Sequence, residues 1–221
     1  MSRLALFDLD NTLIDRDAGY RLWAERFLAA QGVDGAEQAG ELAWLVEMDG
    51  EGLAPRPALF AAIRDRYRLA DDVDALHQAY SDALESLYRP DAEVVGALGA
   101  LQAAGWRTVV ITNGPPSQEV KIRAAGLHDV LDSWCISGVE GVLKPDRAIF
   151  EAAASRCGVP LEGWMVGDNA HADIGGGVGA GLRTIWLSRG RTWDVADYAP
   201  DVVSETVVEA ARTILHDGVT D

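Results

Sequence analysis

The chain has 221 residues, 48% of them hydrophobic, which is enough for one sizeable domain or for a core domain carrying a smaller insert. Its 35 acidic residues outnumber 19 basic ones and give a formal net charge of -16. This charge argues against a nucleic-acid polymer or an anionic membrane surface as partner, because both bind a positive protein face. The acidic composition favours a divalent cation as ligand instead.

Two features of the sequence bear on location. The N-terminal residues run straight into an apolar segment, without the basic region and long apolar stretch of a secretory signal. No segment approaches the run of about 18 apolar residues that a membrane span needs. We therefore expect a cytoplasmic protein with no membrane partner.

The first expected strand covers Leu4 to Phe7, and a long helical tract follows it before any second strand. Four amphipathic helices are expected in this tract, beginning at Asp17, Glu37, Pro57 and Asp72, with Asp17 as the cap of the first. The pair Arg89-Pro90 is expected to stop the fourth helix. Short connections between the helices indicate a small antiparallel bundle, which we place at residues 16–89.

From about Ala92 strands and helices alternate, as they do in the βαβ units of a parallel sheet. Further strands are expected over Arg107–Ile111, Trp134–Ser137, Trp164–Val166, Thr184–Leu187 and Val202–Ser204, and helices over Glu93–Ala104, Ser117–Ala125, Asp146–Cys157 and Glu205–His216. The strands are almost continuously apolar, as a sheet buried on both faces requires. The sequence thus predicts an α/β fold, a doubly wound parallel sheet formed by residues 1–15 and 90–221, with an all-helical insert.

Two carboxylates, Asp8 and Asp10, stand two positions apart where the first strand ends. Alternation along an extended chain points both side chains the same way, and two like charges so close need a cation or a shared proton between them. A strand capped by a turn would also explain the pair, since Asp is favoured in turns.

The next two strand ends carry further polar groups. Thr112 and Asn113 precede a turn that opens a helix, where a hydroxyl and backbone amides can hold phosphoryl oxygens, although turn chemistry alone also explains them. Lys144 comes just before an expected helix start and is a candidate positive centre in an acidic chain. An ordinary solvated lysine is the alternative.

The fourth strand end supplies Asp168, and Asp173 follows five residues later. Two acids around a strand-to-helix turn suit Mg²⁺, whereas a helix cap by Asp173 is the plainer explanation. In a doubly wound sheet the ligand site lies at the carboxyl ends of the strands. All these side chains are therefore expected at one edge.

With these four motifs in order, the chain resembles the haloacid dehalogenase superfamily of phosphohydrolases, in the branch that includes phosphoglycolate phosphatase and carries a helical cap after the first motif. The resemblance implies a Rossmann-like catalytic core with a cap at residues 16–89. It also implies roles for individual residues: Asp8 as nucleophile, Asp10 as general acid/base, Thr112 and Asn113 in phosphoryl binding, Lys144 in charge neutralisation, and Asp168 with Asp173, Asp8 and the backbone carbonyl of Asp10 as Mg²⁺ ligands.

The activity that this resemblance implies is Mg²⁺-dependent hydrolysis of a small organic phosphomonoester through an aspartyl-phosphate, by a monomer or homodimer. The dehalogenase branch lacks an acid at position 10, because a halide leaving group needs no proton, so Asp10 favours phosphate transfer. A phosphosugar mutase stays open as an alternative, with Asn11-Thr12 favouring hydrolysis over it. A catalytically silent binding protein is disfavoured because every catalytic position is filled.

The segment Met48–Pro57 between two cap helices is the candidate specificity loop, and Arg56 is flanked by prolines within it. We hypothesise that Arg56, together with Arg16, contacts the leaving group of the substrate. An ordinary helix–helix connection is the alternative reading of the loop.

Overall fold

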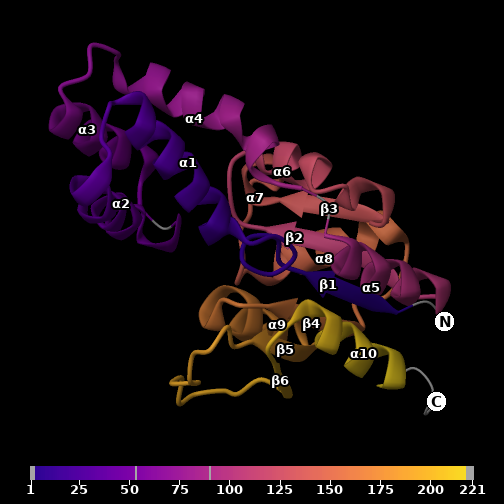
Figure 1. The fold of residues 1–221 in the computed structure, drawn as a ribbon. Helices are drawn as coiled ribbons and strands as arrows, with labels where there is room; N and C mark the ends of the chain where they lie inside the picture. Colours follow the sequence, from indigo (N-terminus) through magenta and orange to yellow (C-terminus); the bar gives the residue numbers. More distant parts are fainter. Residues whose placement is uncertain (1–2, 53, 90, 218–221) are drawn as a thin grey trace. The chain divides into compact units, whose positions relative to one another are not determined.

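The computed structural model describes residues 3–52, 54–89 and 91–217 (Figure 1). It divides into two compact units, Met1–Ile14 with Arg89–Asp221, and Asp15–Tyr88. We call the first the core unit and the second the helical unit. Pro90, the expected helix stop, and Leu53 of the expected specificity loop lie outside the described residues.

The core unit is built on a six-stranded parallel sheet with the strand order β3-β2-β1-β4-β5-β6. The strands are β1 (Leu4–Phe7), β2 (Arg107–Thr112), β3 (Ser133–Ile136), β4 (Gly163–Gly167), β5 (Arg183–Leu187) and β6 (Val202–Ser204). Phe7 at the end of β1 is paired with Val110 of β2 and Val166 of β4. The predicted α/β class is confirmed, and each expected strand is present within one residue of its expected bounds.

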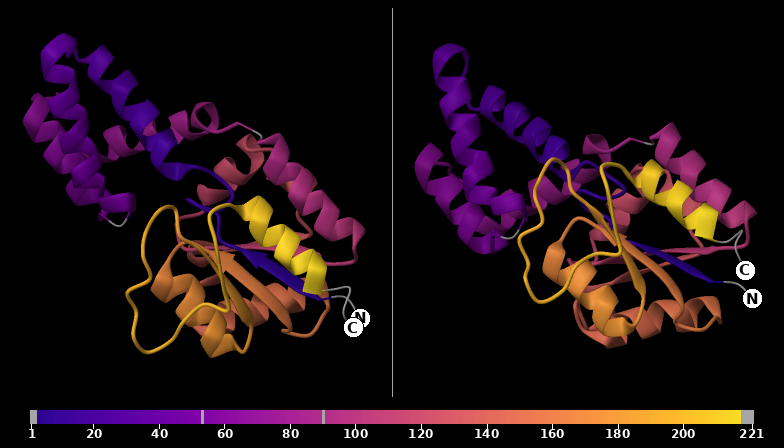
Figure 2. Two further views of the ribbon diagram at one scale, coloured as in Figure 1. Left: turned by 60° about the horizontal axis from the view of Figure 1, so that its bottom comes forward. Right: turned by 90° about the horizontal axis from the view of Figure 1, so that it is seen from below.

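Helices cover both faces of this sheet (Figure 2). On one face lie α5 (Ala92–Ala103) and α10 (Val207–Asp217), which pack against each other, and on the other lie α8 (Arg147–Cys157) and α9 (Gly176–Ala180). Asp91 and Asp146 cap α5 and α8 by accepting backbone N–H groups. An apolar cluster lies between α8 and the sheet and holds Leu6, Ile111, Phe150 and Met165, each fully buried.

Shorter helices connect the strands: α6 (Gln118–Ala124), η2 (Leu127–Asp129), α7 (Ser137–Glu140) and η3 (Ala170–Gly175). The sequence did not predict α7, and β3 ends at Ile136 instead of Ser137 because Ser137 already begins that helix. Asn169 caps η3, and Asp173 lies inside this π-helix. Asp173 is therefore not the helix cap of the plainer interpretation.

The helical unit contains α1 (Arg16–Ala30), α2 (Gly35–Asp49), η1 (Gly50–Gly52), α3 (Arg56–Tyr67) and α4 (Val73–Leu87). Its interior is aromatic: the ring of Trp23 meets Tyr80 edge-on at 5.0 Å between centroids and Phe60 at 6.0 Å. Asp72 caps α4, which begins one residue later than expected. The expected cap of α1 was wrong, because the helix starts at Arg16, so Asp15 is the residue that accepts the N–H of Ala18.

Across the described residues, no helix combines the length and the apolar character that crossing a membrane requires.

Candidate active site

A buried lysine joins two of the aspartates at the carboxyl edge of the sheet. Lys144 Nζ lies 2.6 Å from Asp8 Oδ1 and 2.8 Å from Asp173 Oδ1, and it also donates to the carbonyl of Ile111 at 2.6 Å. Lys144 is 3% exposed and Asp173 is fully buried. Three charged side chains, from the segments that follow β1, β3 and β4, therefore share one enclosed position.

The ionisation of this group is set by burial and by mutual attraction. Burial raises the pKa of Asp8 to about 7, and nearby Asp173 adds to the shift while Lys144 opposes it. For Lys144, burial disfavours the charged form, but Asp173 and Asp8 overcome it and the pKa rises. The lysine thus stays an ammonium, and the carboxylates around it need more positive charge than it supplies.

The carboxylates of Asp8, Asp168 and Asp173 form a donor group suited to a metal ion. One oxygen from each lies within 4.8 Å of the others. Several carboxylate oxygens converging at a strand end are the hard ligands that Mg²⁺ prefers. The side chain of Asp10 is outside this group.

Asp168 also contacts a loop that the sequence did not single out. Arg191 Nη2 donates to the Asp168 carbonyl at 2.7 Å and to Oδ2 at 3.1 Å, and Trp186 Nε1 donates to the same carbonyl at 2.9 Å. Burial and then the charge of Asp8 raise the pKa of Asp168 to about 6, against the opposing Arg191. Nothing in the sequence around Arg191 signalled this contact.

Thr112 and Asn113 lie at the end of β2, but their side chains do different things. Thr112 is 1% exposed, and its hydroxyl accepts a hydrogen bond from Gln118 Nε2 at 2.8 Å. The Asn113 side chain donates to the Lys144 carbonyl and accepts the Lys144 N–H, both at 2.9 Å. The side chain of Asn113 therefore fixes the backbone of Lys144, and a phosphate-binding role for Asn113 falls to its backbone amide.

Asp10 is held by two residues of α6 that sequence reasoning missed. Lys121 Nζ lies 2.8 and 2.9 Å from the two Asp10 oxygens, and Gln118 Nε2 lies 2.8 Å from Oδ2. A signal was available: Gln118, Lys121 and Ile122 share one helical face, and all three are buried. Polar residues on the inner stripe of a helix that opens at a strand end indicate a site.

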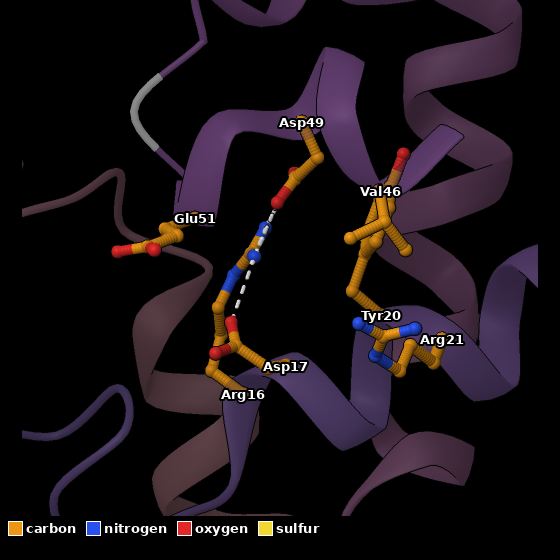
Figure 3. A pocket seen from close by; sticks show the side chains of 7 residues that line it. All are labelled: Arg16, Asp17, Tyr20, Arg21, Val46, Asp49 and Glu51. Atoms are coloured by element: carbon orange, nitrogen blue, oxygen red, sulfur yellow. Dashed lines mark hydrogen bonds and ion pairs between the residues drawn. The ribbon is translucent and has the colours of Figure 1, made fainter. Parts of the chain in front are cut away.

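Arg56 belongs to the helical unit, where it forms part of a second charged cluster. Asp49, 1% exposed, binds Arg16 through both guanidinium NH₂ groups and accepts from Arg56 Nη1 at 2.9 Å. Figure 3 shows Arg16 reaching Asp49 across a cavity of about 140 Å³, which Tyr20 and Glu51 also line. The Arg16 side chain is 3% exposed and that of Arg56 24%.

Both a family model and individual proteins of known name are similar to this chain. Residues 3–181 match the family model described as haloacid dehalogenase-like hydrolase. The pyrimidine 5'-nucleotidase YjjG of Escherichia coli (strain K12) is 36% identical over 124 residues, 55% of this chain and 55% of that protein, so the chain spans about half of this curated relative. A glyceraldehyde 3-phosphate phosphatase of Pyrococcus abyssi is 31% identical over 201 residues, 86% of this chain and 83% of that one.

Among solved structures, the Bacillus subtilis protein YfnB, bound to magnesium, superimposes with a TM-score of 0.75. The match covers 96% of this chain and 98% of that one at 24% identity, which shows a shared fold.

Proposed function

Because the chain belongs to the haloacid dehalogenase-like hydrolase family, we propose that it hydrolyses a small organic phosphomonoester, with Mg²⁺ as cofactor and Asp8 as nucleophile. The observation that carries this proposal is the buried contact of Lys144 with Asp8 and Asp173, beside the carboxylate of Asp168. A nucleophilic carboxylate flanked by an ammonium and a cation-binding group is suited to attack on an anionic phosphoryl group.

The donor set fits Mg²⁺, with Asp8, Asp168 and Asp173 as candidate side-chain ligands and Asp10 contributing through its backbone carbonyl. When bound, the ion would withdraw charge from the phosphoryl oxygens and favour the ionised form of Asp8. Three carboxylates against the ammonium of Lys144 and the guanidinium of Arg191 leave an excess of negative charge, which favours a bound cation.

In the proposed reaction an Oδ of Asp8 attacks phosphorus in line, and the bond between phosphorus and the ester oxygen breaks. Lys144 offsets the charge of the phosphoryl oxygens, and the Thr112 hydroxyl and the Asn113 amide orient them. Asp10 gives its proton to the departing alkoxide. It then takes a proton from the water that attacks the aspartyl-phosphate, which restores Asp8 and releases phosphate.

Asp10 also bears on the choice between leaving groups. A halide departs without a proton, whereas an alkoxide needs one, and Asp10 places a carboxyl group that can carry a proton two residues after Asp8. This placement supports phosphate-ester hydrolysis over dehalogenation. Substrates named for the relatives, pyrimidine 5'-nucleotides and glyceraldehyde 3-phosphate, are the first to test on this chain.

The test is phosphate release from a panel of small phosphomonoesters with Mg²⁺, using Asp8→Asn as the blank. We expect release by the native protein, none above background from Asp8→Asn, and loss on chelation of all divalent metal. Undiminished release from Asp8→Asn or after chelation would overturn the proposal. With a sugar 1-phosphate and its bisphosphate, formation of the isomer instead of free phosphate would identify a mutase.

A further inference from the structure

We propose that Lys121 and Gln118 are positioning residues that orient the Asp10 carboxylate for proton transfer to the leaving group. The inference rests on the proposed function, in which Asp10 is the general acid. It concerns residues of α6, outside the four strand-end motifs. Neither residue is assigned contact with phosphorus or metal.

Two side chains of α6 donate hydrogen bonds to the carboxylate of Asp10. Lys121 spans both carboxylate oxygens, and Gln118 approaches Oδ2 from one turn earlier on the helix. Both residues are buried, at 7% exposed for Lys121 and 3% for Gln118, while the Asp10 side chain is 26% exposed. The half-buried carboxylate is thus the more accessible partner, and the buried donors approach it from the inner face of α6.

Gln118 also ties Asp10 to the expected phosphoryl-binding group. Its Nε2 donates to Thr112 Oγ1 as well as to Asp10 Oδ2, both at 2.8 Å. Gly114 leaves room for this side chain, because a Cβ there would lie 2.8 Å from Gln118 Cγ. One amide therefore sets the spacing between the acid and the hydroxyl.

A fixed orientation of the carboxylate is more important for a general acid than for a carboxylate on the protein surface. Asp10 lies beyond the end of β1 in a tight turn, where Asn11 has a φ of 62° and Asp10 forms an isolated bridge with Ile14, so its side-chain torsions are not set by a helix or a strand of the sheet. A proton donor must stay within hydrogen-bond reach of the leaving oxygen, and a displacement of about 1 Å can cost about 100-fold in rate. Two donors on a helix supply that constraint.

The experiment compares two substrates of nearly equal shape, 4-nitrophenyl phosphate and phenyl phosphate. The nitrophenolate departs with little protonation, whereas the more basic phenolate depends on the acid. In Lys121→Met we expect kcat/KM for phenyl phosphate to fall about 100-fold, with a loss of only about 5-fold for the nitrophenyl ester. The ratio of the two rates does not depend on how much of the variant is folded.

Arg123→Met is the matched control, since Arg123 is a cation of the same helix that pairs with Glu119 on the exposed face. It should leave both rates unchanged. Gln118→Leu should shift the ratio in the same direction as Lys121→Met. In an Asp10→Asn background, Lys121→Met should have no further effect on the ratio, because it acts through Asp10.

Equal losses on both substrates in Lys121→Met, or a further shift in the Asp10→Asn background, would show a general structural role and overturn the inference while leaving the proposed function intact. Absence of phosphate release by the native protein from either ester and from the wider panel would remove the proposed function, and this inference with it.

Discussion

Gly167, the last residue of β4, lies against the carboxylate of Asp173 so closely that a Cβ added to it would be 2.2 Å from Oδ2 and 2.3 Å from Cγ. The missing side chain leaves the space in which the fully buried carboxylate accepts the Asn169 N–H at 2.9 Å and meets Lys144. The strand end and the π-helix are therefore fitted to each other at this glycine.

Gly167→Ala is expected to displace Asp173 and separate it from Lys144. We expect the free energy of unfolding to fall by about 3 kcal/mol, as when one partner of a buried ion pair is lost. Urea-induced unfolding followed by circular dichroism measures the change. Gly179→Ala is the matched control: no atom lies within 4 Å of a Cβ at this helical glycine, and alanine there should stabilise by about 0.5 kcal/mol. Equal stability of the two variants would contradict the role given to Gly167.

Mg²⁺ should stabilise the folded chain through the three converging carboxylates. A ligand present at 100 times its dissociation constant stabilises by about 2.7 kcal/mol, so the thermal midpoint should rise with Mg²⁺ and fall again on chelation. Asp168→Asn should remove most of this shift because one ligand loses its charge. Asp129→Asn, at a side chain 78% exposed, should keep it. A Mg²⁺-induced rise of the same size in Asp168→Asn would exclude Asp168 as a ligand.

The meeting of the strand-end residues followed from the order of strands and helices alone. Apolar runs bounded by Gly, Pro and Asp predict the strands, and parallel crossovers bring every carboxyl end to one edge. Asp8, Thr112, Lys144 and Asp168 then share that edge whatever their side chains do. The position of these residues at one edge can therefore be predicted from the topology of the sheet alone.

The contacts made by helices and loops could not be predicted in the same way. Lys121 reaches Asp10 because of the rotational phase of α6, which the shared face of Gln118 and Lys121 indicates only in part. Arg191 reaches Asp168 from a loop, and no local pattern encodes that contact. Asn113 could be placed at the edge by its position, but the sequence does not say that its side chain binds the Lys144 backbone. Side-chain direction is the part that tertiary contacts determine.

Asp49 gives the helical unit a pH-dependent stability. Burial opposes its ionisation, but the hydrogen bonds and charges of Arg16 and Arg56 outweigh burial and lower its pKa below 3.8. A lowered folded-state pKa contributes stability that is fully present above the unfolded value and is lost as the pH falls through the folded one.

Asp49→Asn should therefore reduce the free energy of unfolding by about 3 kcal/mol at pH 7, because it leaves Arg16 buried without its counter-ion. The difference from the native protein should shrink as the pH falls below 3.8, because the unfolded chain then takes up a proton at Asp49 while the native carboxylate, with its lowered pKa, stays ionised. Urea unfolding at steps between pH 7 and pH 3 measures both. Asp34→Asn, at an exposed helix start where the side chain makes no capping hydrogen bond, should change stability by less than about 0.5 kcal/mol. A difference independent of pH would refute the assignment to Asp49.

Arg56 is the candidate contact to the leaving group within the helical unit, since its side chain keeps 24% of its surface exposed while Arg16 is buried. Its guanidinium is steadied by Asp49 and by the ring of Tyr80, whose centroid lies 5.6 Å away. A steadied cation loses little conformational entropy when it binds an anionic or polyol group.

Arg56→Ala should raise KM about 10-fold for the preferred phosphomonoester and leave kcat within about twofold, because a contact made equally in the ground and transition states contributes to binding alone. Arg64→Ala is the matched control on the same helix, since Arg64 pairs with the neighbouring Asp65 and is 39% exposed. It should leave both constants unchanged. Steady-state kinetics over the substrate panel measures both constants, and circular dichroism verifies that the variants are folded. An unaltered KM in a folded Arg56→Ala protein would show that Arg56 does not contact the leaving group.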